Sequence, residues 1–409
     1  MAMGVEVRTI HNDELPAWAE AMRVGFLGHA SEGEAEMMAE VVHEVDRTTG
    51  AFDGAKVVGT LRSFTTDLSV PGGMVSCSAL TNVTVTGTHR RQGLLTRMLT
   101  RDLAESAERG EAVSSLIAAE YPIYGRFGYG PAVEAVDLTI DGATTFLAPV
   151  ESGSLEMVER ADIRAHAPGL YEALRAEHPG AIGRFDWRWD FDLGLRVWPG
   201  RPEKTPRFFV LGRDDQGRPD GYLIYWVEDI WVNERPKGVL HVEELVGRDT
   251  EALGRLWRYA VEVDWIATIV AENRSVDDLL PWLVVDARMI EQKNRGDIEW
   301  VRILDPVAAL SGRRYLVPGR VVLEIVDPLG HASGRYALDG GPDGSDCQPT
   351  TESADLTLGV DTLSACYLGG YLLGDLARAG RVEELTPGRL ASADAMLRAP
   401  AAPWCITYF

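Results

Sequence analysis

Hydrophobic residues near the start of the chain follow first a strand pattern and then a helix pattern. Residues 5–10 alternate between apolar and polar positions, and residues 14–26 carry apolar side chains at helical intervals. In residues 51–72, two apolar segments are separated by the turn signal Asp53–Gly54 and closed by Pro71–Gly72. These patterns predict a strand, a helix and an antiparallel hairpin.

Three further elements complete this first unit. Residues 78–85 alternate as a strand, and residues 93–109 then show helical spacing. The short apolar run in 112–120 predicts a buried strand. The predicted order β-α-β-β-β-α-β is typical of a compact α/β domain, which we place at residues 1–150.

The same order returns in the middle of the chain. Residues 207–232 predict a hairpin around an Asp-Gln-Gly turn, 238–247 predict a strand, and 250–264 predict a helix. This repetition indicates a diverged internal repeat. We place the second, degenerate unit at residues 151–298.

The last part of the chain, residues 299–409, has a different pattern. It predicts one leading helix, several antiparallel strands and closing helices, and it ends in an apolar, strand-like tail over 403–409. Strands and helices in separate runs are typical of an α+β domain. The chain is therefore predicted to hold three domains of the α/β (α+β) class.

Composition and charge narrow the class of protein. The 45% hydrophobic and 25% charged content of the 409 residues is ordinary for a globular protein, and no apolar run is long enough to span a bilayer. The N-terminal segment lacks the pattern of a signal peptide. The net charge of -22 disfavours nucleic acid as a partner, and it fits either solubility or the attraction of cations.

The cysteines and histidines follow no metal-binding pattern. The four cysteines are scattered without a CxxC pair, and the eight histidines show no helical or short-loop pairing. We therefore expect no metal and no disulfide framework, and we expect a reducing, cytoplasmic location. The cysteines are Cys77, Cys347, Cys366 and Cys405.

One turn of the first unit carries candidate chemistry. Arg90, Arg91 and Gly93 lie between the predicted strand and the following helix. A helix N-terminus offers free N–H donors and partial positive charge, so such a turn can hold a phosphate; a structural turn with two solvated arginines is the alternative. The corresponding turn of the second unit carries Asp249 and Glu251, which predicts that this copy binds no phosphate.

Sequence motifs at this turn and beyond it resemble a known family. The R-x-x-G-x-L turn at 90–95, the segment IYGRFGYGPA at 123–132 and the terminal Phe409 closely resemble the Eis (enhanced intracellular survival) family of GCN5-related N-acetyltransferases (GNAT). The resemblance covers the whole chain. It implies two tandem GNAT-like domains with mixed sheets, followed by a domain similar to sterol carrier proteins at 299–409.

The resemblance also implies a site for acetyl-CoA as co-substrate. Backbone groups along one strand edge would hold the pantetheine arm, the turn and the start of the helix would hold the pyrophosphate, and the end of the next strand would flank the acetyl group. In that order, the residues implied are Val83, Thr84 and Val85; Arg90, Arg91, Gln92, Gly93, Leu94, Leu95 and Thr96; and Ala119 and Glu120.

Two catalytic residues follow from the same resemblance. Tyr124 matches the family's proton donor, and Phe409 matches the residue whose C-terminal carboxylate acts as base. A tyrosine of ordinary pKa near 10 can protonate a departing thiolate, and a C-terminal carboxylate of pKa about 3.5 stays ionised and can accept a proton. From the residues alone, Tyr124 could also be a packing aromatic and Phe409 part of a frayed terminus, although the apolar tail favours burial.

The substrate stays open at this point. The resemblance implies polycationic aminoglycosides in a large acidic cleft, to which Asp53 and Glu120 could contribute, and a homo-oligomer, a hexamer. Gly28 and Tyr408 stand where acidic residues would favour such a substrate. The rival functions are acetylation of lysine on proteins or peptides, and non-catalytic binding of acyl-CoA or lipid by the third domain.

Overall fold

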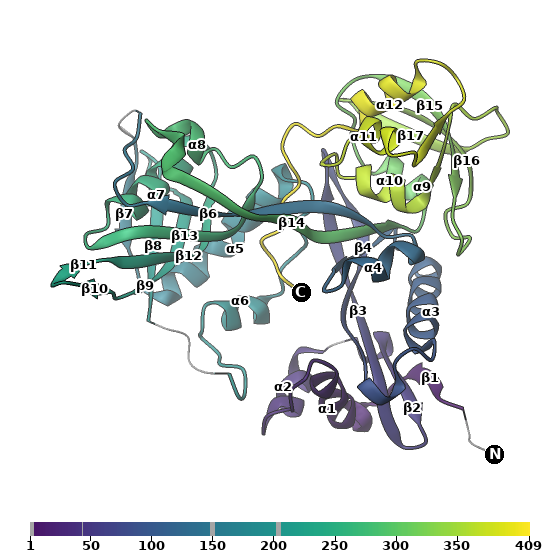
Figure 1. Ribbon diagram of the computed structural model, residues 1–409, viewed down its shortest axis with the longest axis horizontal. Helices are drawn as coiled ribbons and strands as arrows, with labels where there is room; N and C mark the ends of the chain where they lie inside the picture. The colour runs from purple at the N-terminus through teal and green to yellow at the C-terminus, as the bar shows by residue number, and fades with distance from the viewer. Residues whose placement is uncertain (1–3, 43, 148–151, 202–205) are drawn as a thin grey trace.

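The computed structural model describes residues 4–42, 44–147, 152–201 and 206–409. These residues form a 12-stranded sheet, a 5-stranded sheet and a 2-stranded ribbon. Figure 1 shows the large sheet running through the first two units, with the small sheet beside the C-terminal helices. The strands of the large sheet, in order across it, are β1 (Glu6–Thr9), β2 (Thr48–Asp53), β3 (Lys56–Val70), β4 (Gly73–Val85), β5 (Val113–Ile117), β14 (Ile290–Ile303), β6 (Gly130–Asp141), β13 (Ile266–Ser275), β12 (Gly238–Gly247), β9 (Pro219–Glu228), β8 (Arg207–Arg213) and β7 (Ser154–Met157).

The first unit confirms the predicted order of elements. Asp53–Gly54 separates β2 from β3, and Pro71–Gly72 separates β3 from β4, as the turn signals predicted. One helix, α2, was missed, because only two of its apolar residues, Met38 and Val41, are buried. The helices of this unit are α1 (Leu15–Gly25), α2 (Glu34–Val41), α3 (Leu94–Glu108) and α4 (Tyr121–Tyr124), and its short 3-10 helices are η1 (Asn12–Glu14), η2 (Val45–Arg47), η3 (Gly87–His89) and η4 (Gly125–Phe127).

The second unit confirms the predicted repeat. Its hairpin β8–β9, strand β12 and helix α7 follow in the same order as the hairpin β2–β3, strand β4 and helix α3. Strand β12 pairs in parallel with β13 just as β4 pairs in parallel with β5. The remaining elements of this unit are α5 (Arg160–Glu177), α6 (Asp186–Asp192), the ribbon β10 (Trp231–Val232) and β11 (Arg235–Pro236), α7 (Thr250–Glu262), α8 (Leu280–Leu283) and η5 (Ala287–Met289).

Strand β14 joins the two units into one sheet. It lies between β5 and β6 and pairs with both in antiparallel ladders, while β6 pairs on its other edge with β13. Separating the units would therefore break both ladders of β14. The domain limits at 150 and 298 stay a prediction, and β14 spans the second of them.

Glu299 of β14 is fully buried at this join. The Ser115 hydroxyl donates a hydrogen bond to its Oε1 atom, and burial raises the pKa of Glu299 to about 8. The folded protein therefore keeps this proton at neutral pH, whereas an exposed glutamate loses its proton near pH 4.3.

Replacement of Glu299 by glutamine is expected to stabilise the protein at alkaline pH. Between about pH 4.5 and 8 the unfolded chain binds fewer protons than the folded protein, so the wild type loses stability as the pH rises through this window. Glutamine does not titrate, so Glu299→Gln avoids this loss of stability. Its free energy of unfolding at pH 8.5 should exceed that of the wild type by about 2 kcal/mol. Denaturant titrations at pH 5 and pH 8.5 measure it; an equal difference at both values would contradict the assignment.

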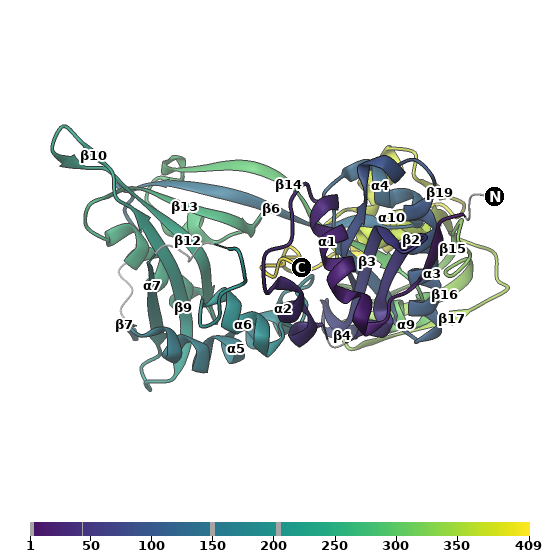
Figure 2. The same cartoon turned by 90° about the horizontal axis from the view of Figure 1, so that it is seen from below.

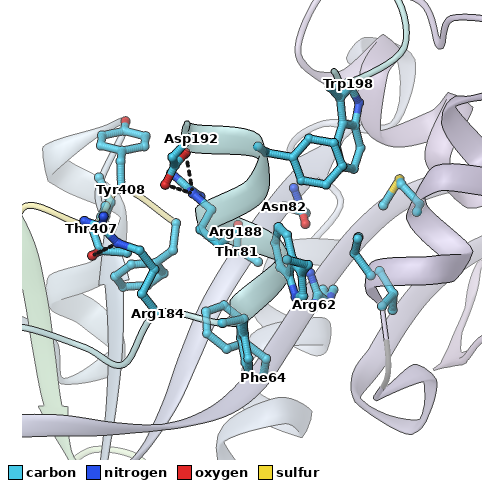
Figure 3. A pocket seen from close by; sticks show the side chains of 18 of the residues that line it. Arg62, Phe64, Thr81, Asn82, Arg184, Arg188, Asp192, Trp198, Thr407 and Tyr408 are labelled. Carbon is cyan, nitrogen blue, oxygen red and sulfur yellow. Dashed lines mark hydrogen bonds and ion pairs between the residues drawn. The ribbon is translucent and has the colours of Figure 1, made fainter. Parts of the chain in front are cut away.

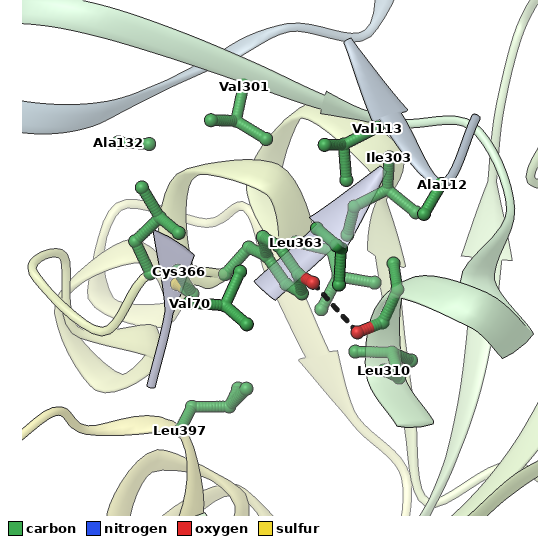
Figure 4. Packing of buried hydrophobic residues seen from close by; sticks show 14 of the residues in the cluster. Val70, Ala112, Val113, Ala132, Val301, Ile303, Leu310, Leu363, Cys366 and Leu397 are labelled. Atoms are coloured by element: carbon green, nitrogen blue, oxygen red, sulfur yellow. Dashed lines mark hydrogen bonds between the residues drawn. The ribbon is translucent and has the colours of Figure 1, made fainter. Parts of the chain in front are cut away.

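The third unit packs tightly on the first. Figure 4 shows Val70 and Val113 from the large sheet against Leu363, Cys366 and Leu397 from the C-terminal helices, all inside one buried cluster. The predicted antiparallel strands are wrong for one pair: β15 and β18 run parallel, because the chain crosses back to the far edge of β15 after the β16–β17 hairpin. The elements are α9 (Pro306–Ser311), β15 (Gly319–Val326), β16 (Gly334–Gly341), β17 (Gly344–Pro349), β18 (Leu356–Gly359), α10 (Val360–Cys366), α11 (Leu373–Arg378), β19 (Val382–Glu384) and α12 (Arg389–Leu397).

The tail over 403–409 forms no strand, so this part of the prediction is wrong. Its polar groups bond to single positions of the second unit: the Trp404 N–H donates to the Pro179 carbonyl (2.8 Å), and the Asn273 amide donates to the Cys405 carbonyl (3.1 Å). The expected burial is confirmed, with Trp404 and Cys405 5% and 1% exposed. Figures 1 and 2 both place the C-terminus in the middle of the molecule, between the first two units.

Candidate active site

A gap opens where strands β4 and β5 separate. Their parallel ladder ends at the pair Leu80 and Leu116, although β4 continues to Val85 and stays paired with β3 on its other edge. Among the described residues, no strand lies beside the β5-facing edge of Val83–Val85. The backbone groups on that edge are therefore free to bind an extended ligand.

A β-bulge at the end of the ladder shapes this gap. Asn82 has a φ of 55°, and the β3–β4 register shifts around it. A bulge bends a strand and increases its twist, which turns β4 away from β5. The second unit has a similar irregularity: the β9–β12 register shifts between Val242 and Glu244.

The N-terminus of α3 is open. Gly93 is its N-cap residue with a φ of 76°. Among the described residues, no side chain caps the helix, and no atom outside the adjoining residues and the helix backbone lies within 4 Å of the position that a Cβ would take. Arg91 also has a positive φ of 63°, and the Arg90 Nε donates to the Val85 carbonyl at 3.3 Å. Free N–H donors at the positive end of a 15-residue helix, beside two exposed guanidinium groups, are suited to an anion, and we call residues 90–96 the anion-binding turn for that reason.

The other predicted residues of this turn differ in the exposure of their side chains. Gln92 and Thr96 are exposed, whereas Leu94 is buried and half-buried Leu95 packs against the same hydrophobic core. The two leucines therefore anchor the helix, and only their backbone can face a ligand.

The second unit closes the equivalent helix end. The Asp249 carboxylate caps α7 and accepts a hydrogen bond from the Ala252 N–H at 2.9 Å. A side-chain carboxylate both occupies a donor and adds negative charge, so this end is unsuited to an anion. The contrast between Gly93 and Asp249 separates the two copies of the fold.

Tyr124 lies at the end of α4 and lines a cavity. Its side chain is 7% exposed, and its hydroxyl has no hydrogen-bond partner among the described residues. Burial, with a smaller contribution from the charge of Glu120, raises the pKa of Tyr124 to about 12, above the ordinary value expected from the sequence. Nearby Tyr129 is also buried, but its hydroxyl is 2.7 Å from the Ser114 hydroxyl, so it is a structural residue.

Residues of the second unit fix the end of the chain. The Thr407 hydroxyl lies 2.7 Å from the Tyr171 hydroxyl and accepts a hydrogen bond from the Arg184 Nε at 3.2 Å. The ring of Phe409 meets that of Phe64 edge to face, with 5.9 Å between the centroids. No hydrogen bond or ion pair within the described residues occupies the Phe409 carboxylate.

The cavity that these residues line has a volume of about 700 Å³. It reaches the gap between β4 and β5 through Leu80, Asn82 and Ala119, and it also contacts Tyr124 and Phe409. Figure 3 shows the wall that the second unit contributes. Arg188 and Asp192 lie on α6 and Arg184 precedes it, next to Thr407 and Tyr408 of the C-terminal tail. One cavity therefore brings together Val83 of the strand edge, Ala119 and the two predicted catalytic residues, whereas the anion-binding turn does not line it.

The cavity is not the acidic cleft that the resemblance implied. Among the described residues, Asp192 is the single acidic side chain that lines it. Glu120 and Asp53 do not line it; Glu120 is exposed, and Asp53 lies 3.3 Å from the His89 ring nitrogen. The lining arginines are Arg23, Arg62, Arg160, Arg184, Arg188, Arg196, Arg201 and Arg207.

Sequence reasoning missed much of this lining. Aromatic residues from four segments meet at the cavity, and the run FDWRWDF, noticed only for its lack of a clean period, supplies several of them. A cluster of aromatics and arginines without helical period was the available signal for a binding wall. These aromatics are Phe26, Phe64, Phe185, Trp187, Phe191 and Trp198.

Comparisons with known proteins match three domain models along the chain. Two models of the acetyltransferase (GNAT) domain match residues 6–132 and 180–303, and the sterol carrier protein domain matches residues 306–406. An uncharacterized N-acetyltransferase of Streptomyces avermitilis is 41% identical over 413 residues, which cover 99% of each protein. The N-acetyltransferase Eis of Mycobacterium tuberculosis is 33% identical over 344 residues, which cover 81% of each.

The chain belongs to the Eis family of N-acetyltransferases. The crystal structure of Eis1 from Mycobacterium abscessus has a TM-score of 0.87 and 30% identity, and the match covers 99% of this chain and 100% of that one. The resemblance and the fold class expected from it are confirmed: two GNAT domains precede a sterol-carrier-like domain. As a member of the family, the protein is an acyltransferase enzyme.

Two further properties of the described residues concern metals and membranes. No group of three or more His, Cys, Asp and Glu side chains in them is arranged to hold a metal ion. No helix among them is long and apolar enough to cross a membrane.

Proposed function

We propose that this chain transfers the acetyl group of acetyl-CoA to a primary amine, with Tyr124 as proton donor and the α-carboxylate of Phe409 as base. The observation that carries the proposal is the single cavity lined by Tyr124, by Phe409 and by the open end of the β4–β5 gap. A donor that enters through the gap and an acceptor that fills the cavity would meet between these two residues.

The open edge and the open helix end support acetyl-CoA as the donor. The unpaired backbone edge of Val83–Val85 suits the amide groups of the pantetheine arm. The uncapped end of α3, with Arg90 and Arg91, suits the pyrophosphate. Ala119 lines the cavity at the end of β5, so we assign it to the acetyl end, and we assign neighbouring Glu120 to the rim.

The proposed transfer balances its protons between the two catalytic groups. The neutral amine nitrogen attacks the thioester carbonyl, the carbon–sulfur bond breaks, and the electron pair stays on sulfur. The amine proton passes to the Phe409 carboxylate, and the thiolate takes the phenolic proton of Tyr124. The proton then returns from the carboxylic acid to the tyrosinate, directly or through water.

Burial acts in the same direction on the donor and the acceptor of the proton that passes from Tyr124 to the thiolate. It raises the pKa of Tyr124, and it equally destabilises a thiolate leaving group in the same cavity. Because the pKa values of the tyrosine and of the thiol both rise, the free energy of this proton transfer changes by less than the rise in the tyrosine pKa alone would imply.

Release of coenzyme A thiol tests this function against its rivals. We expect thiol release from acetyl-CoA that depends on an added primary amine. The acceptor panel should contain an aminoglycoside, a lysine peptide and small aromatic amines, because aminoglycosides and protein lysines both stay candidate acceptors. Binding of acyl-CoA with no amine-dependent release would favour the non-catalytic alternative. A cytoplasmic hexamer stays a prediction.

Gly93→Asp is expected to weaken coenzyme A binding by at least tenfold while the protein stays folded. The aspartate places a carboxylate at the open end of α3, where it caps the helix and repels a pyrophosphate. Calorimetry with coenzyme A measures the change, and Gly93→Asn is the uncharged control that accepts the same positive φ. Equal affinity in the wild type and Gly93→Asp would place the pyrophosphate elsewhere.

A further inference from the structure

Arg62 is a buried cation inside the cavity without a counter-ion. It lies on β3, is 9% exposed and lines the cavity, and Figure 3 shows it beside Phe64 of the same strand. It makes no hydrogen bond or ion pair within the described residues, and its Nε atom is fully buried without a partner. Buried charges in folded proteins are almost always paired, so this guanidinium is an exception that requires an explanation.

Of the seven other arginines that line the cavity, five form ion pairs with carboxylates of the described residues. Arg160 donates to the Gly194 carbonyl, and Arg201 is exposed to solvent, so neither is a buried orphan like Arg62. Ion pairs to carboxylates hold Arg23 with Glu34, Arg184 with Glu244, Arg188 with Asp192, Arg196 with Glu40, and Arg207 with Glu243.

The groups around Arg62 do not supply the missing charge. Glu44 attracts it electrostatically but lies beyond ion-pair distance and accepts a hydrogen bond from the Thr65 N–H at 2.9 Å. Arg47 repels it, although Arg47 is itself paired with Glu111. Burial lowers the pKa of Arg62 to about 10, so the group remains charged at neutral pH and would gain from an anion.

We infer that the acceptor of this enzyme is a primary amine that carries an anionic group, and that Arg62 binds the anion. The inference rests on the proposed function and adds the class of acceptor. Phe64, Phe185 and Trp187 line the same cavity, so the body between amine and anion is apolar or aromatic. Because Arg62 is already desolvated by the fold, binding costs only the desolvation of the ligand's anion.

Two matched amines test this inference. 4-(Aminomethyl)benzoate carries a benzylic primary amine and a carboxylate, and 4-(aminomethyl)benzamide replaces the carboxylate with a neutral amide of the same shape. We expect the wild type to prefer the benzoate by at least tenfold in kcat/KM and in affinity, as the loss of a hydrogen bond to a charged group implies. Affinity is measured on the coenzyme A complex by quenching of tryptophan fluorescence, because Trp187 and Trp198 line the cavity.

Substitution of Arg62 supplies the second arm. In Arg62→Gln the preference should vanish because kcat/KM and affinity for the benzoate fall. The same two quantities for the benzamide should stay within about threefold of the wild type. Arg62→Lys keeps the charge and should retain a preference for the benzoate. If Arg62 instead positioned the Phe409 carboxylate, Arg62→Gln would lower the rates with both amines equally, and the inference would be wrong.

The outcomes separate this inference from the proposed function. Turnover of the benzamide without preference for the benzoate would overturn the inference and leave acetyl transfer intact. Tighter binding of the benzoate than of the benzamide, dependent on Arg62 but without thiol release, would support the anion site and contradict the catalysis. Equal binding of the two compounds would overturn the inference whatever the rates.

Discussion

A short peptide fused after Phe409 is expected to lower acetyl transfer by about a thousandfold, with coenzyme A binding near that of the wild type. The fusion converts the α-carboxylate, which has a pKa of about 3.5 and accepts a proton, into a neutral peptide group. It also adds residues at a point where the chain lines the cavity. The anion-binding turn before α3 does not line this cavity, so the donor should still bind.

Two controls distinguish loss of the base from general damage. A tag of the same length at the N-terminus should be harmless, because β1, the first described strand, is at one edge of the large sheet and lies away from the C-terminus in Figure 1. Phe409→Leu keeps the carboxylate and loses only the contact with Phe64, so its rate should fall about tenfold or less. Wild-type turnover in the protein extended after Phe409 would remove the C-terminal base from the mechanism.

The fold was largely predictable from the sequence because its signals are local. The alternating strands, the helical spacing of 93–109 and the turn signals at Asp53–Gly54 and Pro71–Gly72 depend on neighbouring residues. The repeat was equally visible in the order of its elements. The insertion of β14 between β5 and β6 was not, because strand pairing over almost two hundred residues leaves no local pattern.

The donor side of the candidate site was predictable for a similar reason. A strand, an Arg-Arg-Gln-Gly turn and a helix are adjacent in sequence, and Gly93 takes the positive φ that such a turn requires. The apolar composition of the tail likewise predicted its burial. The absence of a strand there was not predictable, because the tail bonds to Pro179 and Asn273 of a distant unit.

The acceptor side could not be predicted from composition. A net charge of -22 describes the whole chain, whereas the cavity collects arginines from β3, α1, α5 and α6 and buries one of them without a partner. The sign of a cleft depends on which side chains the fold turns inward, and their counter-ions lie behind them, as Glu244 lies behind Arg184. Substrate class therefore has to be argued from the cavity.

Tyr124→Phe is expected to lower kcat about a hundredfold with little change in affinity for acetyl-CoA, because only the phenolic proton is removed. In the wild type, the raised pKa of about 12 keeps that proton in place, so Tyr124 should cause no loss of activity as the pH rises to 10. A tyrosine of ordinary pKa would lose half its protons near pH 10, and the rate would fall there. Initial rates between pH 6 and pH 10.5 measure the profile.

Tyr129→Phe is the matched control for that variant. Tyr129 is more deeply buried than Tyr124 (1% against 7% exposed), and their ring centroids lie 6.0 Å apart. Its hydroxyl bonds to the Ser114 hydroxyl, and its side chain does not line the cavity. Its loss should cost stability of about 1 kcal/mol and leave kcat within about threefold. If both variants lose the same activity, or if Tyr124→Phe keeps full turnover, the hydroxyl of Tyr124 serves packing, and the thiolate must take its proton from water.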